Sequence, residues 1–335
     1  MIMTAIDLRD RKILYHLDID SRQSYGQIGK KVGLSKNSVA YRINKLEEDG
    51  VIQTFFTVIN AHRLHYIYPR FHYVYQYTTP EVRDDIISFF ISHKNANIVA
   101  SVRGTYDLSV MFCVRNIPEM YAIWRDIQQR YGPYFQQQSF SIWLGETQFR
   151  HAYLLSAESR QPDDIKFRNI AGVEKIDIDA IEHGILSCLA ADARLRHSEL
   201  ADTLDTTSKV VRYRVKKLEK LGIIKGYGIT FDLAKLGYNI FKLNIYLRSY
   251  KVRRDIIGHV SRHPGLVCID DTAFESHLEL EFHLEHISQL YEIMEDISAS
   301  FPNAVKNYTY YNVVDVHKYQ WMPVPDHHIT PQCSP

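Results

Sequence analysis

The sequence predicts an α+β fold in which one structural unit, nearly half of the chain, occurs twice. Three observations predict it: the chain repeats itself, each copy begins with short amphipathic helices, and the rest of each copy alternates strand-like and helix-like segments. The 335 residues are 45% hydrophobic, with 40 Lys and Arg against 39 Asp and Glu. This composition supplies enough apolar side chains for several cores and excludes a disordered chain.

The repeat emerges when the chain is aligned with itself so that Ile6 meets Ile178. Residues 6–52 then match residues 178–224 at 15 of 47 ungapped positions, including Tyr41 with Tyr213. Weaker matches extend the two copies to His151 and His317. Between the copies, the polar residues 156–174 are expected to form a linker, and the proline-rich residues 323–335 a flexible tail.

Three helices and a strand are expected at the start of each copy. In the first copy, apolar residues at helical spacing predict the first helix over residues 7–17. A serine cap begins the second helix, residues 24–32, and Gly33 supplies the left-handed turn that follows it. Another serine cap begins the third helix, residues 35–48, after which Gly50 leads into a strand. This order is typical of a winged helix-turn-helix domain.

Basic residues gather on the third helix of each copy. Residues 30–45 carry five Lys or Arg and no acid, and residues 207–225 carry seven against Glu219 alone. A small helical bundle with a solvated charged face is the alternative interpretation. The basic run, however, occurs twice, on the helix that a winged helix-turn-helix places in the major groove. The sequence therefore predicts that the partner is double-stranded DNA.

The side chains expected to contact DNA avoid the apolar stripe of the third helix. They are Ser35, Lys36, Asn37, Tyr41, Arg42, Asn44 and Lys45 in the first copy, and Ser208, Lys209, Arg212, Tyr213, Arg214, Lys216 and Lys217 in the second. Asparagine can read adenine through two hydrogen bonds, whereas Arg42 and Lys45 are expected to contact phosphates. Because the two helices differ at most of these positions, we expect an imperfect palindrome as the preferred site.

The second part of each copy predicts the order β-α-β-β-α-β of a ferredoxin-like domain. In the first copy the expected strands are residues 68–77, 98–103, 107–114 and 140–149, with helices at 80–93 and 118–131. In the second copy the strands are residues 240–247, 266–270, 277–284 and 305–316, with helices at 253–262 and 286–300. The predicted domains are therefore two winged helix-turn-helix domains, residues 1–60 and 175–232, and two ferredoxin-like domains, residues 61–155 and 233–322.

The two copies resemble fused members of the Lrp/AsnC, or feast/famine, family of transcriptional regulators. The resemblance rests on the residue types and spacing of residues 7–22, 28–52 and 104–108, and it is weaker in the second copy, where Thr206-Thr207 replaces Leu-Ser. It implies that the winged helices read DNA and that the ferredoxin-like domains assemble protomers and bind small effectors, commonly amino acids. It also implies an intramolecular pseudo-dimer, with recognition helices about 34 Å apart, that can join further copies into a homo-oligomer.

The resemblance also maps an effector site. In the family, the turn between the second and third strands of the ferredoxin-like domain lies near the effector pocket, which here gives Gly104, Thr105, Tyr106 and Asp107. The alternative is a structural turn that needs glycine for its backbone and aspartate for local capping. The corresponding residues 273–277 of the second copy contain no glycine.

Two further functions stay open from the sequence. A related branch of the superfamily decarboxylates sirohaem with His and Arg residues, and this chain has 16 histidines, although none in HExxH spacing. The other function is that of an architectural protein that coats DNA. No catalytic residue, cofactor or metal site is predicted, because no P-loop, GxGxxG, GxSxG or CxxC motif is present. With no apolar run long enough to span a bilayer, we expect no membrane partner and a cytoplasmic, nucleoid-associated protein of a prokaryotic cell.

Overall fold

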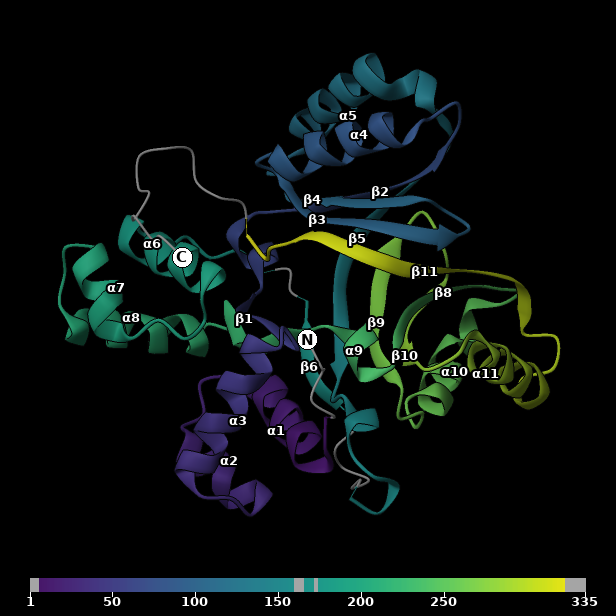
Figure 1. The fold of residues 1–335 in the computed structure, drawn as a ribbon. Helices are drawn as coiled ribbons and strands as arrows, with labels where there is room; N and C mark the ends of the chain where they lie inside the picture. The colour runs from purple at the N-terminus through teal and green to yellow at the C-terminus, as the bar shows by residue number, and fades with distance from the viewer. Residues whose placement is uncertain (1–5, 160–165, 172–173, 323–335) are drawn as a thin grey trace.

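A computed structural model describes residues 6–159, 166–171 and 174–322 (Figure 1). It confirms the predicted α+β fold and the two tandem copies. Each copy begins with a helical unit, and the ferredoxin-like parts of both copies share a single sheet. None of the helices in these residues is long and apolar enough to cross a lipid bilayer.

The three expected helices occur in both helical units. They are α1 (Leu8–Ile19), α2 (Tyr25–Val32) and α3 (Lys36–Glu48) in the first copy, and α6 (Ala180–Ala191), α7 (His197–Thr203) and α8 (Ser208–Lys220) in the second. Ser24 and Ser35 cap α2 and α3 as predicted. Gly33 ends α2 with a φ of 70°, the left-handed conformation that glycine adopts without steric cost. Thr207 caps α8 in the place of Ser35.

The two helical units exchange strands. The strand after each third helix, β1 (Ile52–Ile59) or β7 (Ile224–Phe231), pairs antiparallel with its counterpart from the other copy. Helix α1 packs on β7, and α6 packs on β1. Ile229 accordingly belongs to the buried cluster around α1, and Ile59 to the cluster around α6. Neither unit therefore has a complete core without a strand from the other half.

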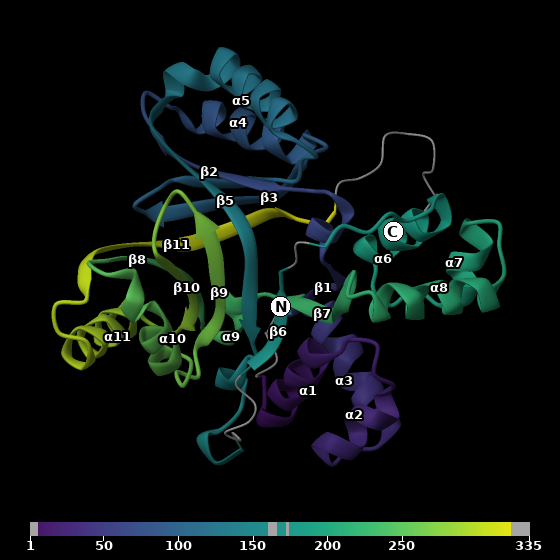
Figure 2. The ribbon, with the colours of Figure 1, turned by 180° about the vertical axis from the view of Figure 1, so that it is seen from behind.

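The ferredoxin-like parts form a closed barrel of eight strands (Figure 2). The order is β5-β2-β4-β3 in the first copy and β11-β8-β10-β9 in the second, and the pairs β3–β11 and β5–β9 join the two. The bounds are β2 (Tyr68–Tyr75), β3 (Ala96–Gly104), β4 (Leu108–Phe112), β5 (Phe135–Phe149), β8 (Asn239–Leu247), β9 (Leu266–Ala273), β10 (Leu278–Leu284) and β11 (Val305–Tyr319). Closure leaves no open edge among these eight strands.

Four helices cover the outside of the barrel, two for each copy (Figure 1). They are α4 (Pro80–Ser92), α5 (Ile117–Tyr131), α10 (Arg253–Val260) and α11 (Ile287–Ser300). Their apolar faces form one core cluster with each half-barrel. The short elements are α9 (Leu233–Leu236), η1 (Ala61–Leu64), η2 (Gly132–Tyr134), η3 (Ala152–Leu154), η4 (Ala157–Ser159) and η6 (Tyr250–Val252).

The connection between the copies differs from the expected linker. Within residues 156–174 lies a strand, β6 (Lys166–Ile170), which pairs antiparallel with the end of β5. Ile170 is fully buried in the same cluster as Ile59 and Ile185. The sequence pattern missed this strand because only a few residues of a polar segment take part in it. The expected tail, residues 323–335, lies outside the described residues.

Candidate DNA-binding surface and barrel interior

Helices α3 and α8 each present one polar face. Val39, Ile43 and Leu46 bury the opposite face of α3, while Tyr41 is 67% exposed and its counterpart Tyr213 is 71% exposed. The structure places most of the expected DNA-contacting residues on the exposed faces: Ser35, Lys36, Asn37, Tyr41, Asn44, Lys209, Arg212, Tyr213, Lys216 and Lys217. The remaining four, Arg42, Lys45, Ser208 and Arg214, are half-buried.

The two half-buried arginines are ion-paired within their own helical units. Arg42 Nη1 lies 2.9 Å from Asp7 Oδ2 and 2.7 Å from Asp10 Oδ1, the two residues of the capping box that begins α1. Arg214 repeats this contact with Asp179 and Glu182 at the start of α6. The backbone N–H of Glu182, together with the Arg214 guanidinium, lowers the pKa of Asp179. The sequence predicted phosphate contact for Arg42 and did not anticipate these acidic partners.

Other cations on the same faces have no acidic partner among the described residues. Within the described part of the chain, the structure records no ion pair for Lys36, Lys209, Arg212 or Lys216, whereas Lys217 Nζ lies 2.7 Å from Glu182 Oε1. Exposed, unpaired cations on a helix face are what phosphate and base contacts require. These four residues are therefore the strongest candidates for charged contacts with DNA.

The predicted effector turn lies at the junction of the half-barrels, and its polar groups have partners there. Gly104 has a φ of 128°, and a Cβ atom on it would lie 2.7 Å from the carbonyl oxygen of Tyr310 on β11. Thr105 donates to that same carbonyl through its hydroxyl. Tyr106 donates to Glu275, and the Asp107 carboxylate accepts the N–H of Tyr75 at 2.8 Å. This arrangement matches the structural alternative for the turn.

The barrel interior contains charged residues that the sequence analysis did not single out. Arg70, which is only 4% exposed, places Nη2 2.5 Å from Glu279 and Nη1 3.4 Å from Asp270. Lys242 Nζ lies 2.9 Å from both Asp270 and Glu281. Burial raises the pKa of Glu279 to about 7, against the influence of Arg70. A buried ionic network that joins strands of both copies is costly to desolvate and demands specific pairing.

A second group in the interior centres on His72. Its ring stacks on Tyr106 with 4.5 Å between centroids, and its Nε2 lies 3.2 Å from the Tyr311 hydroxyl. Its Nδ1 lies 3.6 Å from Glu275. Burial lowers the pKa of His72 to about 3, so the imidazole is neutral at pH 7. The side chains on this face of the junction thus come from both copies.

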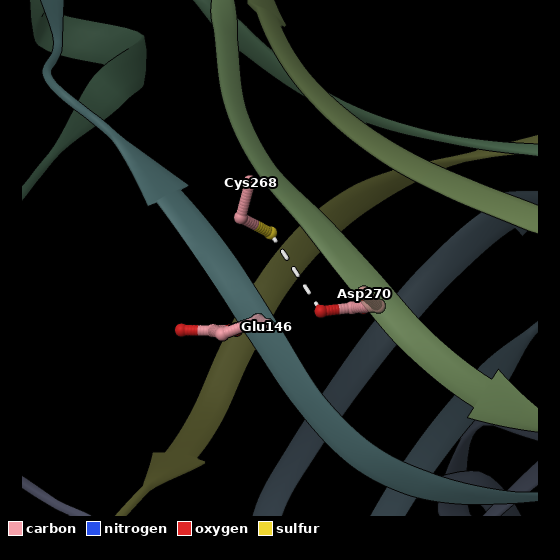
Figure 3. Close-up of side chains that lie close together, drawn as sticks. All are labelled: Glu146, Cys268 and Asp270. Atoms are coloured by element: carbon pink, nitrogen blue, oxygen red, sulfur yellow. Dashed lines mark hydrogen bonds between the residues drawn. The ribbon is translucent and has the colours of Figure 1, made fainter. Parts of the chain in front are cut away.

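The described residues also contain one group with the spacing of metal ligands. Glu146 on β5 lies beside Cys268 and Asp270 on β9, and one ligand atom of each lies within 4.8 Å of the others (Figure 3). The ammonium of Lys242 already lies 2.9 Å from Asp270, where it supplies the positive charge that an ion would bring. The arrangement is therefore explained by an internal ion pair.

Two exposed, basic third helices in winged units define a helix-turn-helix DNA-binding protein, and the comparisons agree. The winged helix-turn-helix DNA-binding family matches residues 6–53 and 178–225, which are the two helical units. The chain is 31% identical over 100 residues to an uncharacterized HTH-type transcriptional regulator of Pyrococcus furiosus, covering 30% of this chain and 68% of that protein. LrpB of Bacillus subtilis is 31% identical over 102 residues, 28% of this chain and 68% of LrpB. The regulatory protein AsnC of Haemophilus influenzae is 28% identical over 119 residues, 35% of this chain and 79% of AsnC.

The chain belongs to the Lrp/AsnC family of transcriptional regulators and contains two family units in tandem. A crystal structure of the siroheme decarboxylase NirDL has the same overall arrangement. This protein superposes on NirDL in its complex with an iron-uroporphyrin III analogue with a TM-score of 0.61. The match covers 93% of this chain and 92% of the NirDL chain, at 12% sequence identity. At this identity the likeness concerns the fold alone.

Proposed function

We propose that this protein is a sequence-specific transcriptional regulator that inserts α3 and α8 into successive major grooves of one DNA duplex. The observation that carries the proposal is the matched pair of exposed faces, each with an exposed tyrosine at the same helical position, Tyr41 and Tyr213. Lys36, Lys209 and Arg212 on these faces supply charge for phosphate and base-edge contacts.

The proposed DNA site is an imperfect palindrome. At the positions equivalent to Asn37 and Asn44, the second copy has Lys209 and Lys216. Asparagine favours adenine and lysine favours guanine, so the two helices would select different half-sites. Selection of duplexes from a random pool would test this directly, and recovery of perfectly symmetric sites would count against it.

Substitution of one uncommitted cation tests the surface itself. Arg212→Ala should weaken binding to the selected duplex by about fivefold or more, as expected for the loss of about 1–3 kcal/mol, and should reduce the dependence of log K on log salt. Arg254→Ala is the matched control, because Arg254 is an exposed arginine on α10, outside the helical units. Equal affinities for wild type and Arg212→Ala, measured by fluorescence anisotropy at fixed salt, would contradict the proposal.

The architectural alternative predicts a different ratio of affinities. A specific regulator binds its selected site about 10³-fold or more tighter than unrelated DNA at the same salt concentration, whereas a coating protein shows little preference. Competition by unrelated duplex in the same anisotropy assay measures this ratio.

The effector expected from the family would be an amino acid bound near Gly104–Asp107. Thermal-shift titration with each amino acid tests this part of the proposal. A shift that Asp107→Asn abolishes would support it, whereas no shift with any amino acid would favour the structural role of the turn.

The decarboxylase alternative rests on the fold shared with NirDL. A substrate that carries several carboxylates requires cations without partners in its site, but Arg70 is already paired with three acids and Lys242 with two. This pairing favours the regulator. Absorbance titration with sirohaem tests the alternative, which predicts a saturable Soret shift.

A further inference from the structure

One cavity lies where the interior of the barrel meets the β1–β7 ribbon. Its volume is about 460 Å³, and its lining includes Trp143 and Glu146 on β5, Lys242 on β8, and Phe56 and Thr230 on the ribbon. A cavity of this size, with mainly apolar walls and a few converging polar groups, is typical of small-molecule sites. The proposed function and the family assignment make no use of it.

Three of the cations that line the cavity are committed to other partners. Lys242 lies 2.9 Å from two carboxylates, those of Asp270 and Glu281. Arg168 donates through Nη2 to the backbone carbonyls of Ile19 and Tyr227, and Lys318 donates to two further carbonyls. These side chains therefore offer no surplus positive charge to an anionic ligand.

Hydrogen-bond acceptors, in contrast, remain available. Glu146 is half-buried and accepts one hydrogen bond, from Gln148 Nε2 at 2.5 Å. Asn97 is only 4% exposed, yet its Oδ1 has no partner among the described residues, and the buried Oε1 of Gln320 has none either. A buried acceptor without a donor costs free energy, and a ligand that donates hydrogen bonds would recover it.

Glu146 also has an acidic neighbour across the strands. Glu146 lies directly opposite Asp270 in the β5–β9 pairing, so the two acidic residues are neighbours across the strands. The ionisable groups that act on this site from the surrounding elements are Cys268, Asp270, Lys242, Glu281, Tyr319 and Arg168. Burial, together with Asp270, raises the pKa of Glu146 to about 8. The carboxyl group is therefore mostly protonated at pH 7 in the empty cavity.

We propose that the cavity binds a small organic amine whose ammonium group pairs with the Glu146 carboxylate while its apolar body lies against Trp143 and the neighbouring aromatic rings. Asn97 and Gln320 accept hydrogen bonds from the remaining donors of the ligand. Aromatic faces stabilise a nearby ammonium group as well as apolar carbon, so the lining suits both ends of such a molecule.

Calorimetric titration without DNA tests the site independently of the proposed function. The probes are 2-phenylethylamine and 1,5-diaminopentane, with 3-phenylpropionate as the anion of matched shape, all at pH 8. At least one amine should bind the wild-type protein, Glu146→Gln should weaken that binding at least tenfold, and 3-phenylpropionate should not bind. Glu295→Gln, an exposed carboxylate replacement on α11, is the control and should bind like wild type.

The pH dependence gives a second readout that does not rely on a variant. Because the ammonium pairs with ionised Glu146, the affinity of the wild-type protein should fall about fiftyfold between pH 8 and pH 6, as expected for a group with a pKa of about 8. Glu146→Gln should show no such fall. Absence of heat with both amines, unchanged affinity in Glu146→Gln, or preferential binding of the anion would each overturn the proposal.

Discussion

Arg42 on α3 lies 2.7 Å from Asp10 on α1, so the candidate recognition helix is joined by an ion pair to the first helix of its unit. The same relationship recurs in the second copy between Arg214 and Glu182, the counterpart of Asp10. Both arginines project from the middle of a basic helix, yet each is held by the acidic start of its neighbour. The pair therefore fixes the orientation of the helix that would enter the groove.

This ion pair predicts a coupled effect on stability. Arg42→Ala and Asp10→Asn should each lower the free energy of unfolding by about 0.5–1 kcal/mol, because the pair is partly exposed. The double variant should lose less than the sum of the two. Urea denaturation of the four proteins measures the coupling. A rise in DNA affinity for Asp10→Asn would instead indicate that the freed arginine binds phosphate.

Gly104 predicts a site at which alanine is not tolerated. Its positive φ and the 2.7 Å approach of Tyr310 leave no room for a Cβ atom, so Gly104→Ala should lower stability by about 1–3 kcal/mol. Gly258 is the control: it is exposed within α10, with nothing within 4 Å of the place that a Cβ atom would take, so Gly258→Ala should raise stability by about 0.5–1 kcal/mol. Equal effects in thermal unfolding would contradict this account of the β3–β11 junction.

Arg70 predicts a large loss of stability and a partial rescue. Arg70→Met removes the guanidinium from buried Glu279, while Asp270 keeps the ammonium of Lys242 at 2.9 Å, and should cost about 3–5 kcal/mol. Adding Glu279→Gln removes the acid that has lost its partner and should recover part of that loss. Denaturant titration measures the free energies of unfolding of the single and double variants. If the losses of the two single variants simply add, the ionic network does not hold the half-barrels together.

His62 predicts a pH-dependent difference between variants. Its side chain stacks on Trp143, and burial, aided by Lys175, lowers its pKa to about 4, so unfolding takes up a proton between pH 6.5 and 4. The wild type therefore loses stability from this group as the pH falls. Relative to the wild type, the free energy of unfolding of His62→Gln should therefore increase by up to about 1.4 kcal/mol for each pH unit below 6.5.

The control for this prediction is His259→Gln, since His259 lies on α10 beside Asp296 and is less buried. The comparison between variants isolates one histidine from buried acids such as Glu146, whose raised pKa gives a slope of opposite sign. Parallel curves for wild type and His62→Gln from pH 7 to 5 would contradict the assigned pKa.

The local patterns in the sequence were sufficient for nearly every helix and strand. Ser24, Gly33 and Ser35 marked helix ends that depend only on neighbouring backbone groups, and they hold these places in the structure. The exposed faces of α3 and α8 could likewise be predicted, because helical spacing separates Tyr41 from Val39 and Ile43. Such features need no knowledge of distant contacts.

Contacts between the copies could not be predicted in the same way. The exchange of β1 and β7, the strand β6, and the partners of Arg42 all depend on segments remote in the chain. One signal was available: Glu279 and Glu281 alternate with apolar residues in β10, so two charges on one face of a strand indicated a polar interior. No such signal marked Arg70 on β2, because this single charged residue stands among large apolar side chains in the sequence.

Closure of the barrel within one chain has a consequence for how the protein behaves on dilution. A regulator assembled from two identical chains separates into halves below its dissociation constant, and its occupancy of paired sites then falls with the square of concentration. Here the seams β3–β11 and β5–β9 join segments of one covalent chain, so their local concentration is fixed by the connection. The paired arrangement persists at a single molecule per cell, and each half can acquire substitutions without imposing them on the other.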